Sequence, residues 1–114
     1  MSFAMTSDQV RQQTKTVTRR IGWVDLKPGT LLQPIVKGQG LKKGETVELI
    51  GRPIRVTSVS RQQLRDITPQ DVYREGFPKM TREDFIRMFK ASRPRCFIDT
   101  YVTRIEFEYT EPSE

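Results

Sequence analysis

The sequence predicts one small α+β domain in which a few short strands close into a barrel. Three observations lead to this prediction. The chain has 114 residues, which suits one hydrophobic core and leaves no room for two. Residues 101–109 alternate in polarity, as a half-buried strand does, and helix-start signals at Thr68 and Thr81 precede that strand. Closing a small sheet removes its unpaired edges, so a barrel is expected rather than an open sheet.

The N-terminal third contains a predicted helix, a turn and a strand. Ser7 is the expected N-cap of a short helix that runs to about Gln13. Residues 27–29, Lys-Pro-Gly, predict a tight turn because proline presets the first central dihedral and glycine tolerates the positive one. Residues 31–37 follow as a candidate strand, and the glycines and lysines of residues 38–44 predict a loop.

Two later stretches also predict strands. Residues 46–49 and 54–59 form one long strand, or two strands linked by a bulge at 51–53, where Pro53 cannot donate to a central ladder. Residues 101–109 are the clearest strand, with one apolar and one charged face. The apolar face holds Tyr101, Thr103, Ile105, Phe107 and Tyr109, and the other face holds Val102, Arg104, Glu106 and Glu108. The tail that follows is polar, so we expect one domain over 1–114 with its core at about 7–110.

Two helices are predicted between these strands. Thr68 followed by Pro69 is typical of a helix start, and Gly76 is the expected stop. Thr81 and Asp84 resemble a capping box that opens the second helix. The apolar stripe of that helix is interpreted as core and consists of Phe85, Met88 and Phe89.

The charge of the chain is uneven. Twenty Lys and Arg against fourteen Asp and Glu give a formal charge of +6 and a pI near 9.8. Residues 1–44 carry eight basic and two acidic side chains and so account for the whole excess. A local basic face attracts phosphates. We therefore expect an anionic partner, first of all RNA or a nucleotide, with solubility alone as the alternative.

The residue types that are missing exclude several kinds of site. The chain has no histidine and one cysteine, Cys96, so His-dependent triads and Cys/His zinc sites are excluded and no metal or cofactor is expected. A single buried thiol suits a reducing compartment. The apolar runs are too short for a membrane helix, and the polar N-terminus lacks the apolar core of a signal peptide. A cytoplasmic monomer without membrane contact is expected.

Residues 14–20 pack three hydroxyls and three cations into seven positions. As a strand, this segment would turn Lys15 and Arg19 to one face and Thr18 to the other. Lys15 and Thr18 would therefore act together only if the backbone turns or bulges. The alternative is a solvated, β-prone surface segment.

The run Lys15-Thr16-x-Thr18-x-Arg20 resembles the signature of the ASCH (activating signal cointegrator homology) domain family. The resemblance continues at residues 27–29, at residues 74–77 after a short helix, and in the last strand, and it spans about residues 9–109. It is greatest to small bacterial and phage members. It implies a PUA-like fold, a small mixed β-barrel with peripheral helices, and an association with RNA.

The resemblance also implies a set of site residues. One bacterial branch of the family hydrolyses the amide of N4-acetylcytidine with a lysine, a threonine and a glutamate, which fall on Lys15, Thr18 and Glu75. The matching arginine is Arg20. The chain departs from that branch at residues 12–14, where the branch has a glycine, and at Arg19, which replaces an apolar residue.

Such a hydrolysis needs a nucleophile and a base, roles that Thr18 and Lys15 could fill. Lys15 acts as a base only if burial or the neighbouring Arg19 and Arg20 lower its pKa. A close ion pair with Glu75 would instead hold Lys15 protonated, so the two arrangements predict opposite shifts.

Eight further residues are candidates for contacts with substrate or RNA: Thr16, Arg19, Arg20, Trp23, Lys37, Lys42, Lys43 and Tyr73. Trp23 could stack on a base or belong to the core, and the three lysines could contact phosphates or form a solvated loop. Three hypotheses remain open. The chain is an RNA- or nucleoside-binding domain, a hydrolase of acylated cytidine or a ribonuclease using the same pocket, or a module that binds an acidic protein.

Overall fold

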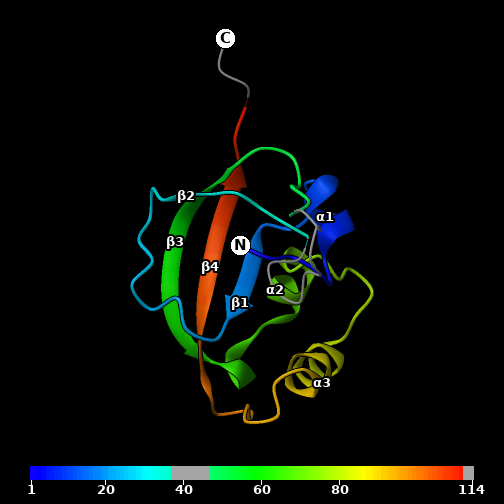
Figure 1. The fold of residues 1–114 in the computed structure, drawn as a ribbon. Coiled ribbons are helices and arrows are strands. Elements are labelled where there is room, and N and C mark those ends of the chain that lie inside the picture. The colour runs from blue at the N-terminus through cyan, green and yellow to red at the C-terminus, as the bar shows by residue number, and fades with distance from the viewer. Residues whose placement is uncertain (37–46, 112–114) are drawn as a thin grey trace.

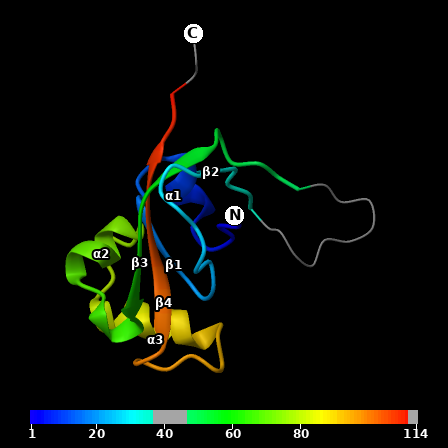
Figure 2. The same ribbon diagram turned by 90° about the vertical axis from the view of Figure 1, so that its left-hand side faces the viewer.

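The computed structural model describes residues 1–36 and 47–111 (Figure 1). Within these residues, four strands form one antiparallel sheet in the order β1-β4-β3-β2. The strands are β1 (Val17–Arg20), β2 (Leu31–Leu32), β3 (Ile54–Gln63) and β4 (Tyr101–Tyr109). The sheet is curled into a half-barrel (Figures 1 and 2). The prediction of a small α+β domain is therefore confirmed. The predicted closure into a barrel is not, because the described strands form a half-barrel in which β1 and β2 are the edges.

Short helices accompany the sheet. They are α1 (Ser7–Arg11), the 3-10 turn η1 (Leu64–Asp66), α2 (Pro69–Arg74) and α3 (Arg82–Ala91). The Thr68 and Thr81 hydroxyls each accept a hydrogen bond of 3.1 Å from the backbone N–H three residues later, so both predicted helix starts are confirmed. Gly76, with φ +102°, follows the end of α2. No helix in the described part of the chain is long and apolar enough to cross a membrane.

Four element boundaries differ from the predictions. The strand predicted at 54–59 extends to Gln63. Helix α1 begins at Ser7 itself, with Thr6 as N-cap, and ends at Arg11. The candidate strand 31–37 shrinks to the two residues of β2, because Pro34 lacks the donor that would continue the ladder. Of the candidate strand 46–49, the described residues contribute only an isolated bridge between Leu49 and Ile35, on the far side of the bend at 51–53.

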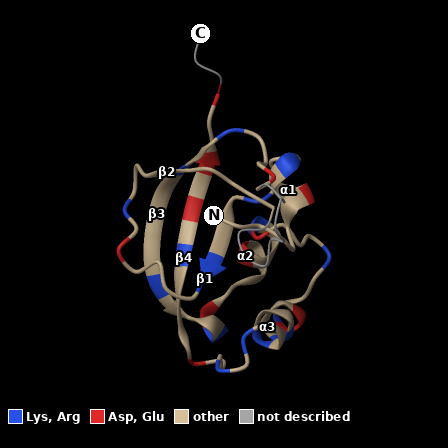
Figure 3. Ribbon diagram, viewed as in Figure 1, with Lys and Arg blue, Asp and Glu red and all other residues tan. Residues whose placement is uncertain are grey.

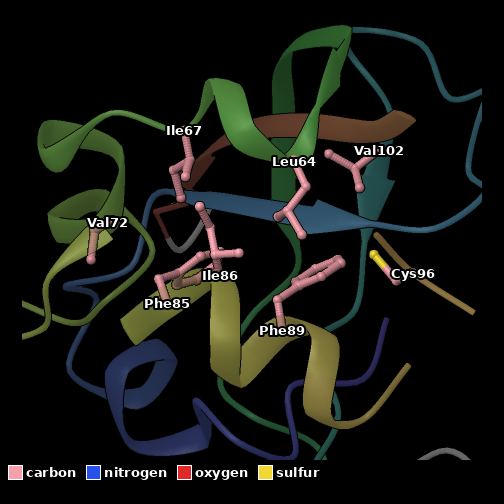
Figure 4. Packing of buried hydrophobic residues seen from close by; sticks show 8 residues of the cluster. All are labelled: Leu64, Ile67, Val72, Phe85, Ile86, Phe89, Cys96 and Val102. Atoms are coloured by element: carbon pink, nitrogen blue, oxygen red, sulfur yellow. The ribbon is translucent and has the colours of Figure 1, made fainter. Parts of the chain in front are cut away.

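Buried side chains pack in two clusters. The first lies between α2, α3 and the start of β4 (Figure 4) and consists of Leu64, Ile67, Val72, Phe85, Ile86, Phe89, Cys96 and Val102. The second comprises Phe3, Val10, Ile50, Ile54 and Phe107. The alternation in β4 holds for Ile105 and Phe107, but Val102 is fully buried on the face predicted to be charged, while Tyr101 is 57% exposed. Helices cover that second face, so sequence alternation alone assigned these two positions wrongly.

Candidate functional site

A cavity of about 230 Å³ lies at β1, the edge strand of the sheet. Its walls come from the N-terminal segment 2–6, from Lys15 and β1, from the residues that follow α2, and from α3 and its C-terminal extension. The polar lining includes Lys15, Thr18, Arg19, Arg20, Glu75 and Arg93. The apolar lining includes Phe77, Phe85, Met88 and Phe89.

Lys15 and Glu75 form the buried pair of this cavity. The Lys15 Nζ atom lies 2.7 Å from Glu75 Oε1 and also donates a hydrogen bond of 2.8 Å to the Glu75 carbonyl oxygen. Two backbone contacts hold the segment in place: Thr16 N–H donates to the Arg74 carbonyl at 2.8 Å, and the Tyr109 hydroxyl donates to the Lys15 carbonyl at 2.6 Å. The end of α2 and the chain before β1 are thus joined directly.

Gly76 explains how these two segments approach so closely. A Cβ atom at this position would lie 2.8 Å from Gln9 Cγ and 3.5 Å from Lys15 Cβ. The backbone also has φ +102°, a conformation that L side chains rarely adopt. Glycine is therefore required both by the backbone angle and by the packing of α1 and Lys15 against the end of α2.

Arg19 continues the charged network inside the protein. Its Nη2 atom lies 2.6 Å from Asp71 Oδ2, and its Nη1 atom lies 3.4 Å from Glu75 Oε2. Asp71 is also held by Arg104, at 2.7 Å and 3.0 Å, and by Arg74 at 3.1 Å. Burial acts to raise the pKa of Asp71, but hydrogen bonds from Arg104 and Arg19 outweigh it and hold that pKa well below its usual range. Arg19 therefore belongs to an internal network as much as to the cavity wall.

Thr18 and Arg20 lie on the opposite face of β1 from Arg19. The Thr18 hydroxyl is buried and accepts a hydrogen bond of 3.1 Å from Arg20 Nε. The pairing of β1 with β4 has a regular register from Val17 to Arg20, so Thr18 and Arg19 point to opposite faces of the strand, and Lys15 lies just before it. They share the cavity because it lies at the edge of the sheet, where it receives side chains from both faces of the strand. Figure 3 shows the basic end of β1 in blue beside β4.

Burial sets the protonation behaviour of the lysine. Burial lowers the pKa of Lys15, the ion pair with Glu75 acts in the opposite direction, and the positive charges of Arg20 and Arg19 add to the lowering. The sequence suggested two opposed effects on this pKa, a lowering by burial and a raising by Glu75. Both effects are present, and the pKa of Lys15 lies below its ordinary value.

The cavity carries an excess of positive charge. Lys15, Arg19, Arg20 and Arg93 line it, against a single carboxylate, Glu75, among the described lining residues. Burial lowers the pKa of Arg20 to about 10; Glu75 opposes this shift and Arg93 adds to it. A lining that combines cations with aromatic rings suits a flat ligand that carries negative charge.

The other candidate residues lie elsewhere. Trp23 is 42% exposed, has φ +53° and is not part of the cavity lining. Tyr73 is 65% exposed and lines a separate shallow groove beside α1. Thr16 is held through its backbone and also lies outside the lining. Lys37, Lys42 and Lys43 lie outside the described residues.

Within residues 1–36 and 47–111, no group of three or more His, Cys, Asp or Glu could hold a metal ion.

Two site residues were not singled out from the sequence. Asp71 lies in the first turn of a correctly predicted helix, but its sequence context shows only a helix-start acid. Arg93 follows α3 and reaches the cavity because α3 and β1 line the same space, a relationship that no local pattern encodes. Phe85, Met88 and Phe89, interpreted as core, also line the cavity.

Comparison with known proteins supplies a fold and no function. No family model and no curated protein matches the chain. The structure is similar to the crystal structure of protein EF3133 from Enterococcus faecalis V583, a protein of the family DUF984, with a TM-score of 0.62 and 17% identity. The similarity covers 91% of this chain and 66% of that protein, so the chain spans less than two thirds of its length. At this identity the similarity shows the fold alone.

Proposed function

We propose that this chain is a PUA-like domain of the ASCH type that binds a nucleoside in the cavity at β1, either free or as an unpaired nucleotide of RNA. One observation carries the proposal: Lys15, Thr18 and Glu75 line a single cavity together with Arg20. These are the positions at which the sequence resembles the ASCH signature. The curled half-barrel sheet is compatible with a PUA-like barrel.

The lining of the cavity offers both kinds of contact that a nucleobase makes. Phe77 and Phe85 offer ring surfaces on which a flat base can pack. The Glu75 carboxylate and the Thr18 hydroxyl offer acceptor and donor groups for the polar edge of the base. A volume of about 230 Å³ lies below the roughly 300–1,000 Å³ of pockets for drug-sized ligands. One nucleoside is therefore the expected occupant.

Calorimetric titration with cytidine and N4-acetylcytidine tests this proposal. We expect one binding site per chain. Thr18→Val, which keeps the side-chain shape and removes the hydroxyl, should weaken binding about tenfold. Thr57→Val, the same change at an exposed position of β3, is the matched control and should leave binding unchanged. No nucleoside binding, or full affinity in Thr18→Val, would contradict the proposal. Loss of affinity for single-stranded RNA with rising salt would support the RNA form.

Hydrolysis of N4-acetylcytidine is the second candidate, favoured by the cavity that the Thr18 hydroxyl shares with a lysine of lowered pKa. The Thr18 oxygen would bond to the acetyl carbon while its proton passes to neutral Lys15. The bond from carbon to N4 then breaks, and Lys15 returns the proton to N4 of cytidine. Water finally cleaves the threonyl ester, releasing acetic acid and restoring the hydroxyl.

Acetate release distinguishes this candidate from binding alone. Thr18→Ser retains a nucleophile and should keep activity, whereas Thr18→Val should lose about a thousandfold or more. Binding of N4-acetylcytidine without acetate release would leave the binding function and exclude the hydrolase. Equal activity in wild type and Thr18→Val would exclude Thr18 as the nucleophile.

A further inference from the structure

Arg20 and Arg93 differ from the other cations of the cavity. Lys15 and Arg19 are paired with carboxylates, whereas neither Arg20 nor Arg93 has a carboxylate within salt-bridge distance among the described residues. Both side chains are half-buried and line the same cavity. Two half-buried guanidinium groups therefore face a common space, and neither forms an ion pair with a described carboxylate.

Each guanidinium is nevertheless held in position. Arg20 donates from Nε to the Thr18 hydroxyl, and its Cζ lies 4.8 Å from the centre of the Phe3 ring. Arg93 stacks on Phe89, with its Cζ 3.8 Å from the ring centre, and its Nη1 donates to the Phe89 carbonyl at 3.0 Å. Aromatic faces and neutral oxygens orient both groups. Within the described residues, both terminal nitrogens of Arg20 and the Nη2 and Nε atoms of Arg93 form no hydrogen bond.

We infer that Arg20 and Arg93 form an anion subsite that takes the phosphate of the bound nucleoside, so that the ligand is a nucleoside monophosphate rather than an uncharged nucleoside. This inference rests on the proposed function, which supplies the site for the base. Preorganised guanidinium groups match phosphate oxygens in planar, charge-assisted pairs.

The charge balance of the cavity supports a phosphate over a smaller anion. Among the described lining residues, Lys15 pairs with Glu75 and Arg19 pairs with Asp71, which leaves the two positive charges of Arg20 and Arg93. A phosphate monoester carries about −1.5 to −2 at pH 7 and offers three acceptor oxygens. Arg93 also lowers the pKa of Arg20, in addition to the larger effect of burial, which indicates that the two positive charges interact. An anion bound between them would relieve this repulsion.

Titration calorimetry with the four common ribonucleosides, their 5′- and 3′-monophosphates, and inorganic phosphate tests the inference. We expect at least one monophosphate to bind at least about tenfold more tightly than its nucleoside. Arg93→Gln should remove that preference, so that nucleoside and monophosphate bind with similar affinities. Arg87→Gln is the matched control on the same helix, since Arg87 is 77% exposed and pairs with Asp84; both affinities should stay at wild-type values.

The outcomes separate this inference from the proposed function. Equal affinity for nucleosides and monophosphates would overturn the phosphate subsite and leave the nucleoside pocket standing. A preference that survives Arg93→Gln would overturn the role of Arg93. Binding of inorganic phosphate that Arg93→Gln abolishes, without any nucleoside or nucleotide binding, would support an anion subsite and overturn the proposed function.

If Arg93→Gln does not fold, Arg93→Lys replaces it. This variant keeps the charge but lacks the planar fork, and an undiminished preference in it would overturn the planar pairing.

Discussion

Lys15 Nζ lies 2.7 Å from Glu75 Oε1, although 60 positions of sequence separate the two residues. Both side chains are almost completely buried. Removing two charges from water is costly, and attraction repays this cost only when the remaining hydrogen-bonding groups are satisfied. The bond from Lys15 to the Glu75 carbonyl and the contact of Glu75 with Arg19 meet this condition. The pair therefore joins the start of β1 to the end of α2 and forms one wall of the cavity.

Breaking this pair should strongly destabilise the protein. Among the described residues, Lys15→Met leaves the buried Glu75 carboxylate with only its contact of 3.4 Å to Arg19. We expect the free energy of unfolding, measured with urea, to fall by about 3–5 kcal/mol. The surface pair Arg55–Glu108, 3.0 Å apart and about half exposed, provides the control. Arg55→Met should cost less than about 1 kcal/mol, and equal losses in the two variants would contradict this prediction.

Asp71 should make stability depend on pH in the acid range. Its pKa in the folded protein is lowered, while that in the unfolded chain is about 3.9. The stabilising contribution of the carboxylate is therefore complete above about pH 4 and is lost as the pH falls toward the folded-state pKa. Asp71→Asn should lower stability at pH 7 and flatten the loss below pH 4, as followed by urea unfolding between about pH 2 and 7. Asp8→Asn, at a position 82% exposed, should leave both the stability at pH 7 and its loss below pH 4 unchanged.

The Tyr109 hydroxyl should lose its proton only at a pH well above that of an exposed tyrosine. Burial raises the pKa of Tyr109 to about 12, and its hydroxyl donates to the Lys15 carbonyl. Because the folded state favours the protonated phenol, its contribution to stability is present below about pH 10 and is lost as the pH rises through about 12. An ultraviolet absorbance titration should show a phenolate step near that pH which disappears in Tyr109→Phe. Persistence of the step in that variant, or its loss in Tyr73→Phe, would contradict the prediction.

Gly76→Ala tests the close approach of α1 to the end of α2. The new methyl group would meet Gln9 Cγ at 2.8 Å in a backbone of φ +102°. Gly29→Ala has a similar angle, φ +91°, with nothing within 4 Å of the added carbon. Backbone strain should cost each variant about 1–2 kcal/mol, and Gly76→Ala should unfold at the lower temperature. Equal melting temperatures would show that Gln9 moves aside without cost.

Local signals in the sequence predicted much of the secondary structure. The Thr68 and Thr81 caps depend on a hydroxyl and an N–H three residues away, so they act within a single turn. The strand at 101–109 was found from its alternation alone. The strand at 31–37 was overestimated because Pro34 interrupts the ladder after Leu32, and Ile35 makes only isolated bridges to Ser2 and Leu49 within the described residues.

The sequence by itself determined an α+β chain with a basic N-terminal third, because these are properties of residue type and near-neighbour spacing. The candidate set of Lys15, Thr18 and Glu75 came from the resemblance of the sequence to the ASCH family. Only the tertiary structure decided that β1 lies at an edge of the sheet, where a cavity accepts side chains from both of its faces. It also decided that Arg19 turns inward to Asp71 while Arg93 reaches the cavity from the end of α3. These relationships join residues tens of positions apart, and the packing of helices against a curled sheet brings them together.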